Sequence, residues 1–224
     1  MKAGLLKKAS CRNPRHSQER ILEAALKEFA AKGFAGARVD AISRQARINK
    51  RMLYHYFGDK EGLFREVLRR KLAERDAWLA SAPEDPIESL PYWFRLACRD
   101  REWVRLLEWE ALQWGEQKVI DEKHRHENAT CAVERLRRRQ ANSLLSSKFD
   151  PGQLLLSMMA LTAYPLAFPQ MARLVTGLSV SDPRFQEQRE TFLRQFAAVF
   201  QAQSADPEPQ VAPALPHRQK TASK

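Results

Sequence analysis

Between residues 39 and 56 the sequence predicts two short helices with almost no chain between them. Apolar residues recur at helical spacing from Val39 to Ala46, and the break falls at Arg47-Ile48. Asn49 is then a favourable N-cap for a helix over Lys50 to Tyr56. Two helices joined by so short a turn, after an earlier amphipathic helix, predict a helix-turn-helix unit of three helices.

The helices on either side of this pair have their own start and stop signals. Ser17 is the predicted N-cap of a first helix that starts at about Gln18, and Gly33 is expected to end it. Gly58 closes the third helix. Asp59 caps a fourth helix, predicted over 60–79, which leaves the unit and joins it to the rest of the chain.

The remainder of the chain also predicts helices, because no strand-like alternation with turn pairs occurs. The expected helices lie at about 86–98, 100–114, 117–146, 152–176 (bent near Pro165 and Pro169) and 183–203. The predicted fold is therefore all-α, with a basic flexible arm over 1–16, a helix-turn-helix domain over 17–59 and a larger helical domain over 60–203. A Pro- and Ala-rich tail over 204–224 is expected to be disordered.

Charge is distributed unevenly along the sequence. Residues 1–75 hold 19 of the 38 Lys and Arg but only 8 of the 27 Asp and Glu, so this third carries the whole net charge of +11. The rest of the chain is balanced. This asymmetry favours a polyanionic partner for the first third, although a solubilising basic face would give the same count.

Several other classes of protein are disfavoured. The longest apolar runs are too short for a membrane span, and the basic N-terminus lacks the apolar stretch of a secretory signal. Three widely spaced cysteines favour neither a disulfide framework nor a zinc site, and they suit a reducing cytoplasm. No nucleophile–base set, phosphate-binding Gly loop or metal motif is present, so we expect neither an enzyme nor a cofactor.

The third predicted helix carries the candidate DNA contacts, because in a helix-turn-helix the second of the paired helices enters the major groove with its N-terminal residues first. Base edges are within reach of Lys50, Arg51 and Met52, whereas phosphates are expected to be bound by Tyr54, His55, Tyr56 and Lys60. Arg38 and Asn49, at the starts of the second and third helices, complete the predicted set. Arg51 either reads guanine by a bidentate contact or lies along the phosphates.

At this point a specific resemblance emerges. The stretches ILEAALKEFAAKGF, VDAISRQARI and NKRMLYHYFGDKEGLF, between Arg20 and Phe64, closely resemble the N-terminal domain of TetR-family regulators. The resemblance implies double-stranded DNA with a palindromic operator as partner, a small-molecule effector of unknown identity, and a nucleoid-associated place in the cytoplasm. It also implies a homodimer through the last two long helices, at about 152–176 and 183–203.

Two departures from the family pattern matter. The family usually has Gly at the place of Arg47, where the turn favours positive φ, so Arg would cost on the order of 1 kcal/mol there and we expect the turn to be reshaped. Small residues are common at the places of Arg51 and Met52. The larger side chains of this chain prevent a transfer of operator sequence from its relatives.

An effector site is predicted on the segment 103–114. Trp103, Leu107, Glu110 and Trp114 fall on one helical face, where a carboxylate among indoles would suit a cationic ligand. The alternative is an ordinary core stripe with Glu110 in a salt bridge. Further candidates for the same site are His126, Tyr164 and Phe168.

Three functions stay open at this level. The leading one is a transcriptional regulator, most simply a repressor, released from its operator by a ligand. The alternatives are a DNA-binding protein without a small-molecule effector, controlled by a partner or organising the chromosome, and an enzyme. His124, Glu127 and Cys131 also share a helical face, but so loose a set is common on solvated helices and no metal site is predicted.

Overall fold

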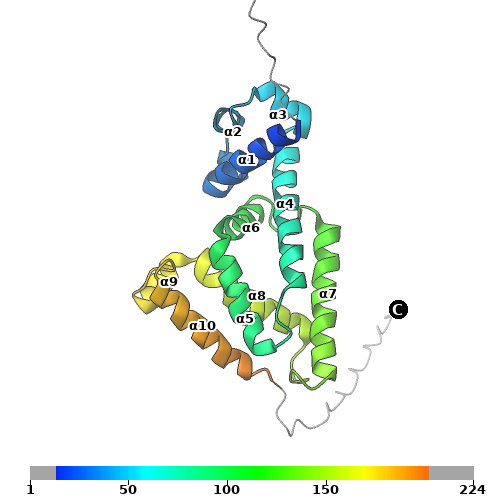
Figure 1. The fold of residues 1–224 in the computed structure, drawn as a ribbon, viewed down its shortest axis with the longest axis vertical. Helices are drawn as coiled ribbons and strands as arrows, with labels where there is room; N and C mark the ends of the chain where they lie inside the picture. The colour runs from blue at the N-terminus through cyan, green and yellow to red at the C-terminus, as the bar shows by residue number, and fades with distance from the viewer. Residues whose placement is uncertain (1–13, 202–224) are drawn as a thin grey trace, which may run out of the picture.

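The computed structural model describes residues 14–201, and within that range the chain forms ten helices and no strand (Figure 1). The prediction of an all-α fold is confirmed. The helices are α1 (Pro14–Gly36), α2 (Val39–Ala46), α3 (Lys50–Phe57), α4 (Lys60–Ala80), α5 (Pro86–Arg99), α6 (Arg101–Trp114), α7 (Glu122–Ala141), α8 (Pro151–Ala167), α9 (Pro169–Thr176) and α10 (Pro183–Ala198).

Helices α1 to α3 form a small bundle at one end of the molecule, and α4 runs from it into the larger helical part (Figure 1). Two of the predicted N-caps are confirmed. The Asn49 side chain accepts a hydrogen bond from the Arg51 amide at 2.8 Å, and Asp59 accepts one from the Gly62 amide at 2.6 Å. These caps fix where α3 and α4 begin, and thereby the direction in which each leaves its turn.

The first helix begins earlier than predicted. It begins at Pro14, so Ser17 is a buried residue inside α1 and not its N-cap. Proline suits the first turn of a helix because its missing N–H has no partner there in any case. Residues 14–16 of the predicted arm are therefore helical, while the rest of that arm and the predicted tail lie outside the described residues.

Gly33, with φ 71° and ψ 178°, interrupts α1 where the sequence predicted its end, and a short helical stretch continues to Gly36. A Cβ at this position would lie 2.6 Å from the ring of Trp109 on α6. Glycine is thus required twice here, by the backbone conformation and by the close approach of an indole.

The larger part of the chain contains shorter helices than predicted. The helix expected over 117–146 is α7, Glu122–Ala141, and the one expected over 152–176 is two helices, α8 and α9, bent by 87°. The bend lies at Phe168 and Pro169, whereas Pro165 lies inside α8. Within residues 14–201 no single helix has the length and apolarity to cross a membrane; α8 and α9 reach both only as this bent pair.

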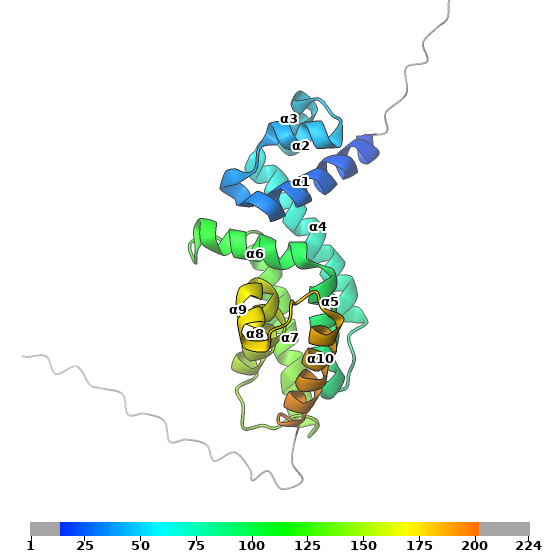
Figure 2. The same cartoon turned by 90° about the vertical axis from the view of Figure 1, so that its left-hand side faces the viewer.

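Three hydrophobic cores hold the molecule together. The first fills the space between α1, α2, α3 and α4 and continues into α6 through Trp103 and Leu106. The second joins α5 to α8, α9 and α10, and the third is a small cluster between α7 and α8. Figure 2 shows α6 passing directly below α1, so the α1–α3 bundle and the larger helical part share a packed boundary and not only the α4 connection.

Candidate DNA-binding surface and effector cavity

The N-terminal end of α3 points away from the core. Leu53 is completely buried and anchors the helix against the first core, and Ile48 and Phe57 pack partly against the same cluster. Helical periodicity then turns Arg51 and Met52 outward, and both are exposed. Among the described residues, nothing holds the Arg51 guanidinium by a hydrogen bond or an ion pair.

Lys50 is exposed too, but it has a partner inside the chain. Its ammonium lies 2.7 Å from a carboxylate oxygen of Asp40 on α2. The hydrogen bond between them raises the pKa of Lys50 and lowers that of Asp40. Exposed pairs of this kind are weak and are screened by salt, so Asp40 does not prevent Lys50 from contacting DNA.

The predicted phosphate contacts divide into two groups. Tyr54 and His55 are exposed, whereas Tyr56 is half-buried and packs against the first core. Lys60 is also half-buried: it donates to the carbonyl of Ala35 at 3.2 Å, and burial lowers its pKa. Lys60 therefore stabilises the connection between α1 and α2, and its contact with phosphate stays a prediction.

The turn between α2 and α3 keeps the left-handed residue that the family pattern has as glycine. Arg47 has φ 53° and ψ 45°, so the expectation of a reshaped turn is wrong. Its backbone N–H donates to the carbonyl of Arg44 at 3.1 Å. The Arg20 guanidinium donates to the carbonyls of Ala46 and Arg47, which satisfies the exposed end of α2 and stabilises the turn in this conformation.

The start of α2 is stabilised by a buried carboxylate. Glu28 accepts hydrogen bonds from the Arg38 amide at 3.2 Å and from Lys32 at 2.8 Å. The bond from Lys32 is the largest cause of the lowered pKa of Glu28. The Arg38 amide is thus satisfied inside the chain, while its side chain is exposed.

A cavity of about 460 Å³ lies in the larger half of the molecule. It is lined by residues of α4, α5, α6, α7 and α8, and it is large enough for a drug-sized molecule. Two of the predicted ligand residues, Trp103 and Leu107, line it. The charged side chains on its wall are Arg75, Glu108, Arg135 and Arg139.

The other predicted ligand residues lie elsewhere. Glu110 is buried and accepts hydrogen bonds from the Ile120 amide at 2.8 Å and from Arg125 at 2.7 Å, which corresponds to the salt-bridged alternative. The Trp114 ring packs in the first core against Phe34 and Phe64. The remaining three, on α7, on α8 and at the bend between α8 and α9, are exposed and do not line the cavity: His126, Tyr164 and Phe168.

The carboxylate that does reach the cavity is Glu108, which sequence reasoning missed. Burial raises the pKa of Glu108, and the nearby Arg105 opposes that rise. The signal was present in the sequence, because positions 103, 104, 107 and 108 share one side of α6. Glu110 was predicted as the ligand-binding carboxylate because it lies between tryptophans in the sequence. Its side chain instead faces the segment that leads into α7.

The histidine-containing face of α7 has a polar role within the chain. His124 lies 3.1 Å from a carboxylate oxygen of Asp76 on α4, and Asn128 donates to the other oxygen at 2.9 Å. Over residues 14–201, no three His, Cys, Asp or Glu side chains are grouped so that they would hold a metal ion.

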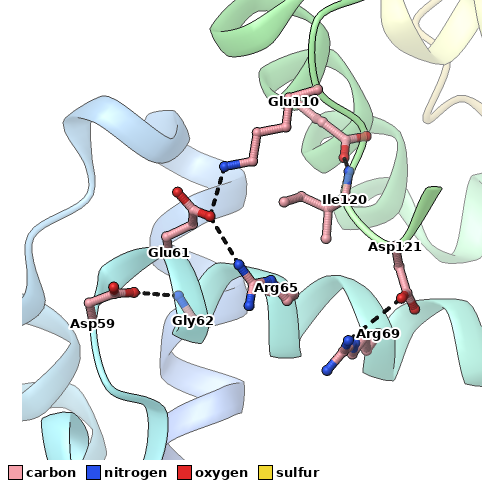
Figure 3. A network of polar contacts seen from close by, with 9 residues as sticks. Asp59, Glu61, Gly62, Arg65, Arg69, Glu110, Ile120 and Asp121 are labelled. Atoms are coloured by element: carbon pink, nitrogen blue, oxygen red, sulfur yellow. Dashed lines mark hydrogen bonds and ion pairs between the residues drawn. The ribbon is translucent and has the colours of Figure 1, made fainter. Parts of the chain in front are cut away.

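A polar network joins α4 to the segment between α6 and α7 (Figure 3). Glu61 lies 2.7 Å from Lys118 and 3.0 Å from Arg65, and Arg69 lies 3.6 Å from Asp121. Glu110 also accepts a hydrogen bond from the Ile120 amide. The segment between α6 and α7 therefore connects the C-terminal half of α6 to the N-terminal end of α4.

Two further hydrogen bonds connect α6 directly to α1. The Arg105 and Trp109 side chains both donate to the carbonyl of Ala30 on α1, at 2.9 and 3.2 Å. The opposite side of the same helix lines the cavity with Trp103 and Leu107. One helix therefore contacts both the cavity and α1.

Comparison with known proteins agrees with this arrangement. Residues 21–67 match the family described as bacterial regulatory proteins, tetR family, and residues 92–198 match the tetracyclin repressor-like C-terminal domain. Over 171 residues the chain is 33% identical to the HTH-type transcriptional repressor SCO4008 of Streptomyces coelicolor, covering 75% of this chain and 88% of that protein. The chain belongs to the TetR family. It is a helix-turn-helix transcriptional regulator and not an enzyme, as the sequence predicted.

Other TetR-family members resemble it over different extents. The HTH-type transcriptional repressor NicS of Pseudomonas putida is 37% identical over 106 residues, or 44% of this chain and 50% of that protein. The crystal structure of the putative transcriptional regulator SCO4942 from Streptomyces coelicolor superposes with a TM-score of 0.69 at 27% identity, covering 84% of this chain and 99% of that one. The ketosteroid transcriptional regulator KstR2 of Mycobacterium tuberculosis, at 18% identity and a TM-score of 0.61, shares the fold.

Proposed function

We propose that this protein is a dimeric repressor that binds a palindromic operator and is released when a small molecule occupies its cavity. The observation that carries the proposal is the exposed N-terminal end of α3, where Arg51 and Met52 have no role in the core. Two relatives, SCO4008 and NicS, are repressors by name. The proposed place of action is the cytoplasm, at the nucleoid.

A dimer is supported by an apolar face that this chain leaves uncovered. Large apolar side chains are exposed along α8 and α9 and at one position of α10, which is more than scattered surface leucines would explain. The exposed members are Leu156, Met159, Tyr164, Phe168, Met171, Leu174, Val175 and Phe192. A dimer also carries two identical helix-turn-helix units, which match a two-fold symmetric operator whose half-sites lie about one helical turn apart.

Release by a ligand requires different ligand affinities in the DNA-bound and the free conformations. Helix α6 supports such a coupling, because its cavity side carries Trp103 and Leu107 while Arg105 and Trp109 bond to α1. A ligand that displaces α6 would move α1 relative to α4. The presence of a formed cavity favours this function over control by a partner protein or a chromosome-organising role.

Selection of bound duplexes from a random DNA pool, at physiological salt, tests the proposal. We expect a palindromic consensus whose half-site spacing fits two symmetric heads. Tight, salt-sensitive binding without any consensus would instead favour the chromosome-organising alternative, because phosphate contacts alone carry no sequence preference.

Substituting Arg51 tests the reading surface itself. Arg51→Ala is expected to relax base preference at one position of each half-site, at a cost of about 1–3 kcal/mol against the preferred base. Arg70→Ala on the exposed middle of α4 is the matched control and should leave the consensus unchanged. Equal weakening of all sequences by Arg51→Ala would show that Arg51 contacts phosphates and not bases.

A further inference from the structure

The charged groups that line the cavity are predominantly basic. Arg75 from α4 and Arg135 and Arg139 from α7 contribute three guanidinium groups, against the single carboxyl group of Glu108. The remaining wall is mostly apolar, with Trp93 and Met158 among its residues, and its uncharged polar members are Ser89 and Thr162. A ligand that fills this space therefore meets an excess of positive charge.

Arg75 is held by aromatic rings and not by a carboxylate. Its guanidinium lies 5.1 Å from the ring centroid of Trp103 and 5.8 Å from those of Trp78 and Trp93. No ion pair reaches it within the described part of the chain. Burial lowers its pKa, opposed by the more distant Asp100 and Asp76. Asp100 is already paired with Lys71 at 2.8 Å, so Arg75 keeps hydrogen-bond donors available to a bound molecule.

Arg135 and Arg139 lie one helical turn apart on α7 and both line the cavity. Arg139 donates to the carbonyl of Pro83 at 3.0 Å, whereas Arg135 has no hydrogen bond or ion pair among the described residues. Burial and the neighbouring Arg135 lower the pKa of Arg139, and the carboxylates of Glu84 and Asp85 only partly oppose this. Like charges at this spacing repel each other, and an anion between them would relieve the repulsion.

Glu108 does not change this balance. Its pKa is raised by burial, so its carboxyl group is held less firmly as an anion than an exposed one would be. It stands four residues from Val104 on the same wall of the cavity. A cationic ligand would thus find one weakened partner and three repelling groups.

We propose that the effector is an anionic amphiphile: a carboxylate, or a group of similar charge, on a flat apolar body that fits a cavity of 460 Å³. The apolar body lies against the tryptophans and Met158, and the anionic group binds the arginines of α4 and α7. This inference rests on the proposed release by a small molecule. It differs from the cationic ligand that was one of the two interpretations of the sequence pattern around Glu110.

Three probes with one aromatic body separate charge from hydrophobicity: 1-pyrenebutyrate, 1-pyrenebutanol and 4-(1-pyrenyl)butyltrimethylammonium. Their dissociation constants are measured on the full chain by fluorescence titration. The anion should bind at least roughly tenfold more tightly than the alcohol, as expected when a hydrogen bond to a charged group is gained, and the cation most weakly. Tightest binding of the cation or the alcohol, or no binding of any probe, would overturn the inference.

Arg135→Gln should remove most of the preference for the anion while leaving binding of the alcohol unchanged, because the guanidinium makes no intramolecular bond whose loss would disturb the fold. Arg138→Gln, on the exposed side of the same helix, is the matched control and should retain the preference. Retention of the preference by Arg135→Gln and by Arg75→Gln alike would contradict the assignment of the arginines.

Release from a selected operator duplex, followed by fluorescence anisotropy, separates this inference from the function on which it rests. If the cation binds most tightly and releases the duplex, the ligand class is wrong and the proposed function holds. If the anion binds with the expected preference but leaves the complex intact, the ligand class holds and release by this ligand fails.

Discussion

Arg47 is the single residue at which this chain departs most from the backbone preference of its side chain. A left-handed conformation costs a residue with a Cβ about 1–2 kcal/mol, and a substitution by glycine removes this cost. The more flexible unfolded state of glycine offsets part of the stability gained in this way. We therefore expect Arg47→Gly to stabilise the protein by about 0.5–1 kcal/mol in urea denaturation. The Arg20 bonds to the backbone of this turn do not depend on the Arg47 side chain and should persist.

The control at the residue scale is Arg44→Gly, inside α2 and equally exposed. It should destabilise the protein by about 1 kcal/mol, because glycine is a poor helix former where φ is already helical. If both variants lost stability to the same degree, the Arg47 turn would carry no backbone strain and its arginine would be stabilising through its side chain.

At the scale of the helices, features set by neighbouring residues could be predicted from the sequence. Features set by residues far apart in the sequence could not. The caps at Asn49 and Asp59 and the outward face of α3 follow from residues within four positions of one another. The late start of α7 does not, because the preceding segment is held by Glu110, ten residues away from Ile120. The cavity was predicted only in part, through Trp103 and Leu107 on α6, because its lining comes from five helices that are distant in the sequence.

Glu110 offers a test of how much that segment depends on one side chain. Glu110→Ala leaves the Ile120 amide and the half-buried Arg125 without their acceptor, and we expect a loss of about 1–3 kcal/mol in the free energy of unfolding. The control Glu116→Ala, exposed in the same segment, should change stability by less than about 0.5 kcal/mol. Equal effects of the two substitutions would show that Glu110 does not hold the segment.

For the molecule as a whole, the position of α6 connects the two proposals. The cavity wall, the bonds to Ala30 and the close approach to Gly33 all belong to this one helix. In the proposed complex, the anionic group binds the arginines of α4 and α7, and the apolar body of the ligand contacts α6 from its cavity side. The helix-turn-helix half is thus linked to the cavity by direct packing, as well as through α4.

The uncovered apolar face carries the prediction that belongs to the whole molecule. Leu174 and Val175 on α9 are 73% and 80% exposed, and in the proposed dimer they are covered by a second copy. Val175→Asp would bury a charge in that interface, so we expect a shift from dimer to monomer in sedimentation equilibrium and a loss of operator binding of at least roughly tenfold. Leu112→Asp, at a 77% exposed leucine on α6, is the matched control and should remain dimeric. A dimeric Val175→Asp variant with full operator affinity would place the interface elsewhere on the molecule.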